Sequence, residues 1–298
     1  MLTRRKCLLT ALPALGGLIV GRRLAFAYFA PADSASISVQ LAELEKKSGG
    51  RLGVAILDTA TGASTGHRAD ERFPMCSTHK FLSAAAILAR VDRHKEDLAS
   101  VVHITQQDLV GYSPVTQTRV GGAGITVHEL CEAAVTLSDN TAANLLLASL
   151  GGPAGWTAYV RTLGDQVTRL DRNEPTLNES LPGDPRDTTS PNAIAADLRK
   201  LVLGDALSPA SRDLLTTWLV QCKTGGQRLR AGVPADWKEG DKTGTGQRGT
   251  SNDVAIFWPP QRPPILVAAF LTGSTLDDAP REGILAAVGK IVASAVHL

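Results

Sequence analysis

Segments with the character of β-strands lie at both ends of this chain, and they enclose a long helical middle. Residues 51–58 and 63–68 are two strands separated by a Thr-Ala-Thr-Gly turn, and residues 252–258 and 264–272 are rich in Val, Ile, Phe and Ala. Strands that follow one another at each terminus pair most simply into one antiparallel sheet. We therefore expect a sheet built from both chain ends, with the helical middle inserted between them.

Helices are predicted beside the sheet and throughout the middle. Residues 36–48 have apolar side chains at helical spacing and end at a Gly pair, and residues 280–296 form a second terminal helix. Further helix starts are marked by a capping box or by a proline in the first turn: Thr126 with Glu129, Pro153, Pro191 and Pro209.

The length supports two closely packed lobes. At 298 residues and 43% hydrophobic content, the chain can form sizeable cores. We predict an α/β lobe from residues 34–67 and 221–298, an all-α lobe from residues 68–220, and an active site in the cleft between them. The fold class is thus α/β plus all-α, with an antiparallel sheet flanked by terminal helices and an inserted helical lobe. The long irregular segment 165–190 is expected to have a function.

The first 27 residues have the pattern of an export signal. Basic residues at 4–6 precede an apolar run over 7–20, and Ala25 and Ala27 supply small side chains at a cleavage site. The run is shorter than the ~20 residues of a membrane-spanning helix, so we expect no stable membrane anchor. The arginine pair also resembles a twin-arginine export signal. We expect a periplasmic protein whose signal peptide, residues 1–27, has been removed.

Charge and cysteine usage exclude several classes of partner. Residues 1–27 hold five basic and no acidic side chains, which leaves 26 Lys and Arg against 29 Asp and Glu, a net charge of −3. The chain has no basic patch, so we do not expect it to bind nucleic acid. We expect a small neutral or anionic substrate instead. The cysteines show no C-x-x-C spacing and the six histidines show no H-E-x-x-H, so we expect neither a metal nor a cofactor.

Ser77 and Lys80 lie one helical turn apart at the start of an apolar stretch, so the ammonium group can reach the hydroxyl. A serine hydroxyl is a poor nucleophile until a base takes its proton or a cation stabilises the alkoxide, and a helix N-terminus adds favourable dipoles. The pattern alone is weak, because about one S-x-x-K is expected by chance in a chain of this length.

Three further motifs follow in order and are much more specific. Each is expected by chance only roughly 0.05 to 0.1 times per chain, and the combination about once in 10,000. They are Ser138-Asp139-Asn140, Glu174-Pro175-Thr176-Leu177-Asn178 and Lys242-Thr243-Gly244. With these motifs the chain resembles the class A serine β-lactamases from about residue 36 to its C-terminus. The resemblance implies the serine β-lactamase/transpeptidase-like fold, with Ser77 at the start of a central helix and K-T-G on an edge strand facing it.

The resemblance also implies a serine acyl-enzyme mechanism. Ser77 would attack the lactam carbonyl, and the backbone N–H groups of Ser77 and Thr245 would form the oxyanion hole. Ser138 would pass a proton to the departing lactam nitrogen, helped by Lys80 and Lys242.

A carboxylate on the irregular segment would complete the reaction. Glu174 and Asn178 would hold the water that hydrolyses the acyl-enzyme. The resemblance leaves open whether Lys80 or Glu174 is the base for acylation, and it assigns Glu174 to deacylation. Arg172 and Asp187 resemble the ion pair that closes this loop. The implied catalytic residues are Ser77, Lys80, Ser138 and Glu174.

The substrate contacts follow from the carboxylate of a β-lactam and from the same resemblance. Asn140 would hydrogen-bond the amide side chain of the substrate, and Tyr112 would form an aromatic wall at the mouth of the cleft. Arg228 would add positive charge for the carboxylate, with Arg248 as the second choice. The substrate-binding residues are therefore Asn140, Asn178, Lys242, Thr243, Gly244, Thr245, Tyr112 and Arg228.

Some residues near the motifs have a structural interpretation. His79 is two positions from Ser77, so on a helix it points away from the hydroxyl, and we predict a packing role. Cys76 is interpreted as a small buried side chain. Cys131 falls where some members of the family have half of a disulfide, but the matching position is Ala84, so we expect no bridge.

Three other functions share part of this pattern. A penicillin-binding D,D-transpeptidase or carboxypeptidase, or a non-catalytic β-lactam sensor, keeps the serine, and Glu174 with Asn178 argues against both. A serine-dependent glutaminase uses a related S-x-x-K, but the S-D-N and K-T-G pair favours β-lactams. We therefore predict hydrolysis of penicillins and cephalosporins by a monomer. Thr245 and Ser251 resemble the cephalosporin-hydrolysing, extended-spectrum branches.

Overall fold

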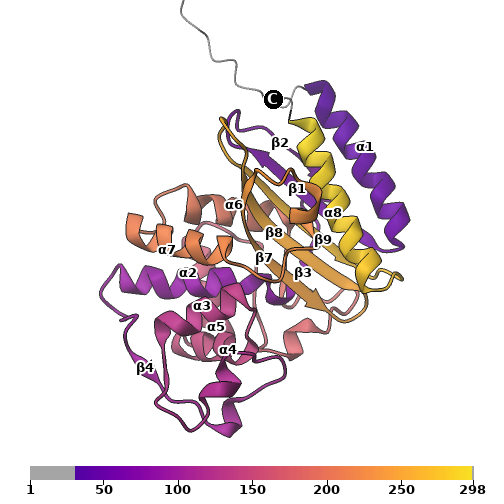
Figure 1. The fold of residues 1–298 in the computed structure, drawn as a ribbon. Coiled ribbons are helices and arrows are strands. Elements are labelled where there is room, and N and C mark those ends of the chain that lie inside the picture. The colour runs from indigo at the N-terminus through magenta and orange to yellow at the C-terminus, as the bar shows by residue number, and fades with distance from the viewer. Residues whose placement is uncertain (1–30, 297–298) are drawn as a thin grey trace, which may run out of the picture.

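A five-stranded antiparallel sheet forms the centre of the computed structural model, which describes the backbone of residues 31–296 and the side chains of residues 35–296 (Figure 1). The export signal predicted over residues 1–27 lies outside the described residues. The strands are β1 (Arg51–Asp58), β2 (Ser64–His67), β7 (Lys238–Gly246), β8 (Thr250–Trp258) and β9 (Ile265–Thr272), in the order β2-β1-β9-β8-β7. β1 pairs with β9 along its whole length, so the prediction that both chain ends build one sheet is confirmed.

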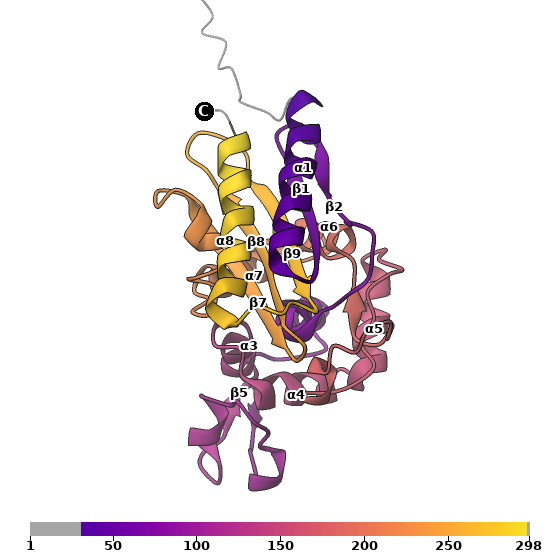
Figure 2. The same cartoon turned by 90° about the vertical axis from the view of Figure 1, so that its right-hand side faces the viewer.

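Both faces of this sheet are covered, as its continuous apolar strands require. Leu266, Ala268 and Phe270 of β9 point into a core shared with the helical middle, while the residues between them point into a second core. The terminal helices α1 (Pro31–Ser48) and α8 (Asp278–Ala295) lie side by side over this second face (Figures 1 and 2). The fold class predicted from the sequence is confirmed.

The helical middle surrounds α2 (His79–Val91), whose residues from His79 to Ala89 are all buried. Among the described residues, the other helices of this part are α3 (Val127–Thr136), α4 (Asn140–Ser149), α5 (Gly152–Thr162), α6 (Pro191–Val202) and α7 (Pro209–Val220). Four short strands form two separate two-stranded sheets: β3 (Phe73–Pro74) pairs with β6 (Thr188–Thr189), and β4 (Val101–Val102) pairs with β5 (Ile125–Thr126). α6 packs on β1 and β9, so the helical middle contacts the sheet directly. The proposed lobe boundaries remain a prediction.

The predicted helix starts are where the sequence places them. Thr126 and Glu129 form a reciprocal capping box at α3, with N···O distances of 3.1 and 2.8 Å. Pro153, Pro191 and Pro209 each lie in the first turn of a helix. The first helix begins at Pro31 rather than at residue 36, since proline is well suited to the first helical position.

Truncation of Phe270 tests the packing of the sheet on the helical middle. Its ring is fully buried, with its centroid 6.1 Å from that of Phe73. We expect Phe270→Ala to lower the free energy of unfolding by about 3–5 kcal/mol, because the cavity cannot close completely. Val39→Ala on the exposed face of α1 is the control, with an expected change within about 0.5 kcal/mol in denaturant titrations. Equal effects of the two substitutions would contradict this account.

Candidate active site

Ser77 lies in a single 3₁₀ turn, η1 (Cys76–Thr78), that runs directly into α2. The edge strand β7 packs against this turn, as the resemblance implied. A Cβ atom at Gly244 would lie 2.7 Å from the carbonyl oxygen of Met75, so only glycine lets the strand approach this closely. Asn252 of β8 fixes the turn from behind, since its Nδ2 donates to the carbonyl oxygens of Pro74 (2.9 Å) and Met75 (3.1 Å).

A cavity of about 480 Å³ opens in front of Ser77. It is lined by Ser77, Tyr112, Ser138, Asn140, Asn178, Thr224, Arg228, Thr243, Gly244 and Thr245. The structure thus brings together all the predicted substrate-binding residues except Lys242, which is fully buried behind the wall. Thr224 was missed by sequence reasoning because it belongs to none of the motifs. Its Oγ1 lies 2.5 Å from Oγ1 of Thr243.

Lys80 and Glu174 form an ion pair that is completely buried beneath Ser77. Lys80 Nζ lies 3.0 Å from Glu174 Oε1, and it donates to the carbonyl oxygen of Ser138 (2.8 Å) and to Oδ1 of Asn140 (2.5 Å). Ser77 Oγ donates to the same Glu174 Oε1 at 3.3 Å. This oxygen therefore connects the predicted nucleophile to the ammonium group.

Burial and charge act in opposite directions on this pair. Burial opposes ionisation of Glu174, yet Lys80 and His79 beside it hold the pKa of its carboxyl group well below the ordinary value. Burial also lowers the pKa of Lys80, and the charge of Glu174 partly offsets that effect. The side chain of Glu174 is therefore ionised at neutral pH.

Ser138 lies between two ammonium groups. Lys242 Nζ donates to its Oγ at 3.0 Å, and Lys80 Nζ lies 3.4 Å from the same oxygen. Ser138 also has a positive φ of 59°, a strained backbone conformation of the kind found at functional sites. Burial lowers the pKa of Lys242 to about 8. The hydroxyl of Ser138 is thus placed to receive and pass on a proton.

Glu174 is held by its backbone as well as by its side chain. Asn178 Nδ2 donates to Glu174 Oε2 at 2.5 Å. Asn144 forms two hydrogen bonds of 2.9 Å with the backbone of Glu174, one to the carbonyl oxygen and one from the N–H group. Asn144 was not among the predicted site residues. Its position one turn after Asn140 on α4 was the available signal, but the sequence does not show that its partner, Glu174, comes from a distant loop.

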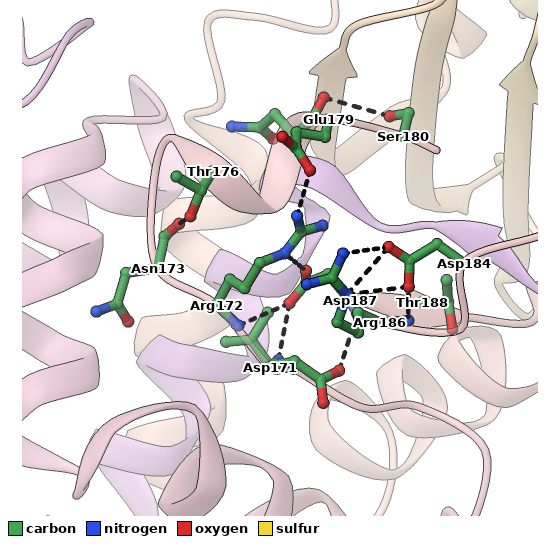
Figure 3. Close-up of polar contacts among 12 residues, drawn as sticks. Asp171, Arg172, Asn173, Thr176, Glu179, Ser180, Asp184, Arg186, Asp187 and Thr188 are labelled. Atoms are coloured by element: carbon green, nitrogen blue, oxygen red, sulfur yellow. Dashed lines mark hydrogen bonds and ion pairs between the residues drawn. The ribbon is translucent and has the colours of Figure 1, made fainter. Parts of the chain in front are cut away.

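The loop that carries Glu174 is closed by the predicted ion pair (Figure 3). Arg172 Nε donates to Asp187 Oδ2 and its Nη1 donates to Glu179 Oε2, both at 2.6 Å. Asp187 is buried, and its Oδ1 accepts from the backbone N–H groups of Asp171 (2.7 Å) and Arg172 (2.9 Å). The two limbs of the loop are therefore joined at its base.

The two candidate arginines differ in position. Arg228 is buried against β7, and its guanidinium donates to the carbonyl oxygen of Gly244 (2.8 Å) and to Oγ1 of Thr245 (2.7 Å). Arg248 lies outside the cavity and donates to the carbonyl oxygen of Glu179. The structure therefore places only Arg228 at the cavity wall.

Cysteines Cys76, Cys131 and Cys222 are all buried and free, so no disulfide forms within residues 31–296. Burial raises the pKa of the Cys76 thiol to about 12, which keeps it unreactive. In the same described part of the chain, no group of three or more His, Cys, Asp or Glu residues is placed to hold a metal ion.

A nucleophile at a helix start, a buried ion pair and a proton-transferring serine define a serine-dependent acyl-transfer enzyme. Residues 36–296 match the sequence model of a family described as "Beta-lactamase enzyme family". The chain is 51% identical over 263 residues to β-lactamase AST-1 of Nocardia asteroides, with 88% of this chain and 84% of that protein covered. It is 49% identical over 261 residues to β-lactamase CTX-M-8 of Citrobacter amalonaticus, covering 88% and 89%.

Solved structures agree with the sequence matches. The class A β-lactamase of the last common ancestor of Gram-negative bacteria (GNCA4) is 63% identical, with a TM-score of 0.87 and coverage of 88% of this chain and 100% of that one. The chain belongs to the class A β-lactamase family. It hydrolyses β-lactams through the serine acyl-enzyme mechanism of that family and thereby confers antibiotic resistance. This membership sets aside the transpeptidase, sensor and glutaminase alternatives.

Substitution of Asp187 tests whether the ion pair at the base of the loop positions Glu174. Asp187→Asn leaves the charge of Arg172 without its buried partner, and we expect a loss of roughly 3–5 kcal/mol in unfolding free energy. Hydrogen exchange should also become faster in residues 165–190. Asp184→Asn is the matched control, because Asp184 pairs with the exposed Arg186 of the same loop and should change stability by less than about 1 kcal/mol. Unchanged exchange in Asp187→Asn would refute the positioning role.

Proposed function

We propose that Ser77, Lys80, Ser138 and Glu174 hydrolyse penicillins and cephalosporins in this enzyme. The observation that carries the proposal is the convergence on Glu174 Oε1, which accepts from Ser77 Oγ at 3.3 Å and lies 3.0 Å from Lys80 Nζ. An ionised carboxylate within hydrogen-bonding distance of a hydroxyl is placed to take its proton.

Acylation begins with attack of Ser77 Oγ on the lactam carbonyl carbon. The hydroxyl proton passes to Glu174, which the hydroxyl contacts directly, whereas Lys80 has its hydrogen bonds elsewhere. The backbone N–H groups of Ser77 and Thr245 stabilise the oxyanion, and loss of one such donor typically costs about 100- to 1,000-fold in rate. The C–N bond then breaks, Ser138 gives its proton to the lactam nitrogen, and Lys80 or Lys242 restores that proton. Glu174 then passes the proton taken from Ser77 to Lys80, 3.0 Å away, which recharges the donor lysine directly or through Ser138 and leaves the carboxylate ionised for deacylation.

Deacylation uses the other side of the same carboxylate. A water held between Glu174 and Asn178 attacks the ester carbonyl, its proton moves to Glu174, and the C–O bond to Ser77 breaks. The proton then returns to Ser77 Oγ, so that the enzyme is unchanged at the end of the cycle. The hydrogen bond of 2.5 Å between Asn178 Nδ2 and Glu174 Oε2 supports this assignment, because it fixes the two groups that would orient the water.

Substrate binding is assigned to the residues of the cavity wall. Thr243 and Ser138 bind the substrate carboxylate, Arg228 adds positive charge at the wall, and Lys242 adds it from behind Ser138. Asn140 has one amide hydrogen bonded to the carbonyl oxygen of Gly111, so its second remains for the substrate's amide group. The exposed ring of Tyr112, the two hydroxyls of Thr224 and Thr245, and Gly244 complete the wall.

An extended spectrum that includes cephalosporins is part of the proposal. Thr245 of β7 is paired in register with Ser251 of β8, so Ser251 lies beside Thr245 but behind the cavity wall. Arg281 Nε lies 3.4 Å from Ser251 Oγ, and Arg228 donates to Thr245. Positive charge is therefore supplied at this end of the site although no arginine occupies position 251.

We also propose that the enzyme is a periplasmic monomer exported by the twin-arginine route with residues 1–27 as its signal peptide. The arginine pair, the apolar run and the small residues near position 27 support this. No helix among residues 31–296 is long and apolar enough to cross a membrane.

Substitution of the carboxylate tests the proposed cycle. We expect Glu174→Ala, incubated with benzylpenicillin or a cephalosporin, to accumulate a covalent adduct on Ser77, because acylation can still use Lys80 one helical turn away, whereas deacylation loses its general base, a contribution of about 10²- to 10⁴-fold. Intact-protein mass spectrometry should show the adduct on the variant and rapid substrate loss without a lasting adduct on the wild type. Ser77→Ala is the control and should form no adduct. A lasting adduct on the wild type would contradict a deacylating enzyme.

The lowered pKa of Lys242, about 8, predicts an alkaline limit on substrate binding. Lysine is charged below its pKa, so the positive charge that Lys242 supplies from behind the cavity wall is lost as pH rises above about 8. At pH 9 only about a tenth of it remains charged, and KM for benzylpenicillin should rise on the order of tenfold over the value at pH 7. Lys242→Arg should remove this dependence, because guanidinium stays charged. A KM that is flat to pH 9.5 in the wild type would refute the assignment.

A further inference from the structure

His79, the residue just before Lys80, contacts the loop that carries Glu174. Its side chain is completely buried, and its Nε2 makes no hydrogen bond among the described residues but lies 3.5 Å from Glu174 Oε1. The ring packs edge-on against Trp156, with centroids 6.1 Å apart and an angle of 77° between the planes. The packing role predicted from the sequence is therefore only part of its role, because one ring nitrogen faces the carboxylate.

The surroundings determine which nitrogen of His79 carries the proton. Nδ1 lies 3.2 Å from Ser83 Oγ, one turn along α2, and the single hydrogen of this hydroxyl can go either to Nδ1 or to the carbonyl oxygen of His79, also 3.2 Å away. Glu174 Oε1 is an anionic oxygen and can only accept, so an unprotonated Nε2 facing it would be repelled. The anionic oxygen therefore favours the tautomer in which Nε2 carries the hydrogen and Nδ1 accepts from Ser83 in place of the carbonyl oxygen of His79.

We propose that His79 is a positioning residue for deacylation, whose Nε2–H group donates to Glu174 Oε1 and holds the carboxylate toward the hydrolytic water. The inference rests on the proposed role of Glu174 as the deacylating base. It adds a group that touches neither the substrate nor Ser77 and acts only through that carboxylate.

The contribution of His79 is needed most in the acyl-enzyme. In the free enzyme Glu174 Oε1 has three neighbours: Ser77 Oγ, Lys80 Nζ and His79 Nε2. Once Ser77 is esterified, its oxygen has no hydrogen to donate. Only Lys80 and His79 then hold Oε1, at the stage when Glu174 must take a proton from water.

The charges around the ring indicate that it works as a neutral donor. The ionisable groups facing it are Glu174 from the loop, Lys80 from α2 and Lys242 from β7. Burial is the largest effect and lowers the pKa of His79, the two lysines act in the same direction, and Glu174 opposes them. A donor to the carboxylate favours its ionised form, so removal of the imidazole should raise the pKa of Glu174.

Two substitutions separate the hydrogen bond from the packing. His79→Phe keeps an aromatic ring against Trp156 and removes the donor, whereas His79→Gln places an amide N–H group near the position of Nε2. We expect His79→Phe to slow deacylation of benzylpenicillin roughly tenfold in stopped-flow and mass-spectrometric measurements, as a displaced catalytic group does. Its acylation rate should change less than about threefold. The acid limb of its deacylation pH profile should move to higher pH, and His79→Gln should restore both the rate and the limb.

The outcomes separate this inference from the role of Glu174. Normal deacylation in His79→Phe, together with an arrested adduct in Glu174→Ala, would overturn the inference alone. An equal slowing in His79→Phe and His79→Gln with no movement of the acid limb would also overturn it. In the Glu174→Ala background, His79→Phe should cause no further loss, since its effect passes through the missing carboxylate. Full turnover by Glu174→Ala would overturn both assignments together.

A measurement on the unsubstituted enzyme covers the case in which the Phe variant does not fold. Nitrogen-15 chemical shifts of the imidazoles report which nitrogen is protonated, and the His79 signal is identified by its loss in His79→Gln. We expect the Nε2–H tautomer in the resting enzyme. The Nδ1–H tautomer would overturn the inference, because Nε2 could then donate nothing to Glu174.

Discussion

The buried ion pair between Lys80 and Glu174 is the interaction on which the rest of the site depends. Two charges without solvent are tolerated only when each is paired and its remaining hydrogen-bonding capacity is used. Lys80 Nζ meets this condition with the carbonyl oxygen of Ser138 and with Asn140, and Glu174 meets it with Asn178. The pair thus determines where the S-D-N segment and the catalytic loop must lie relative to α2.

A loop can supply a catalytic group only when its backbone is fixed as firmly as a regular element. Here the 165–190 segment has few regular hydrogen bonds of its own, and side chains replace them. Asn144 binds the backbone of Glu174 on both sides, and Asp187 binds the backbone of Arg172 as well as its guanidinium. These contacts fix the position of the carboxylate although Glu174 itself lies in neither a helix nor a strand.

The sequence predicted what depends on local spacing and missed what depends on the path of the loop. The strand pattern, the capping box of Thr126 and the motif residues at one helix start all follow from short-range rules. Helical geometry predicted that His79 points away from Ser77, but it could not show that Glu174 would contact both side chains. Arg228 was predicted from its charge alone, and its hydrogen bonds to Gly244 and Asn252 required the pairing of β7 with β8.

The site separates the residues that select a substrate from those that move protons. Tyr112, Thr224 and Thr245 line the cavity, where we propose that the substrate binds. Lys80 and Glu174 lie behind the wall among hydrogen bonds that a substrate cannot reach. A substitution of Tyr112 or Thr224 can therefore change which β-lactams enter while the buried network keeps its geometry, whereas Asn140 belongs to both groups because it also accepts from Lys80. The reverse also holds, because a change behind the wall alters the rate of hydrolysis for every substrate that binds.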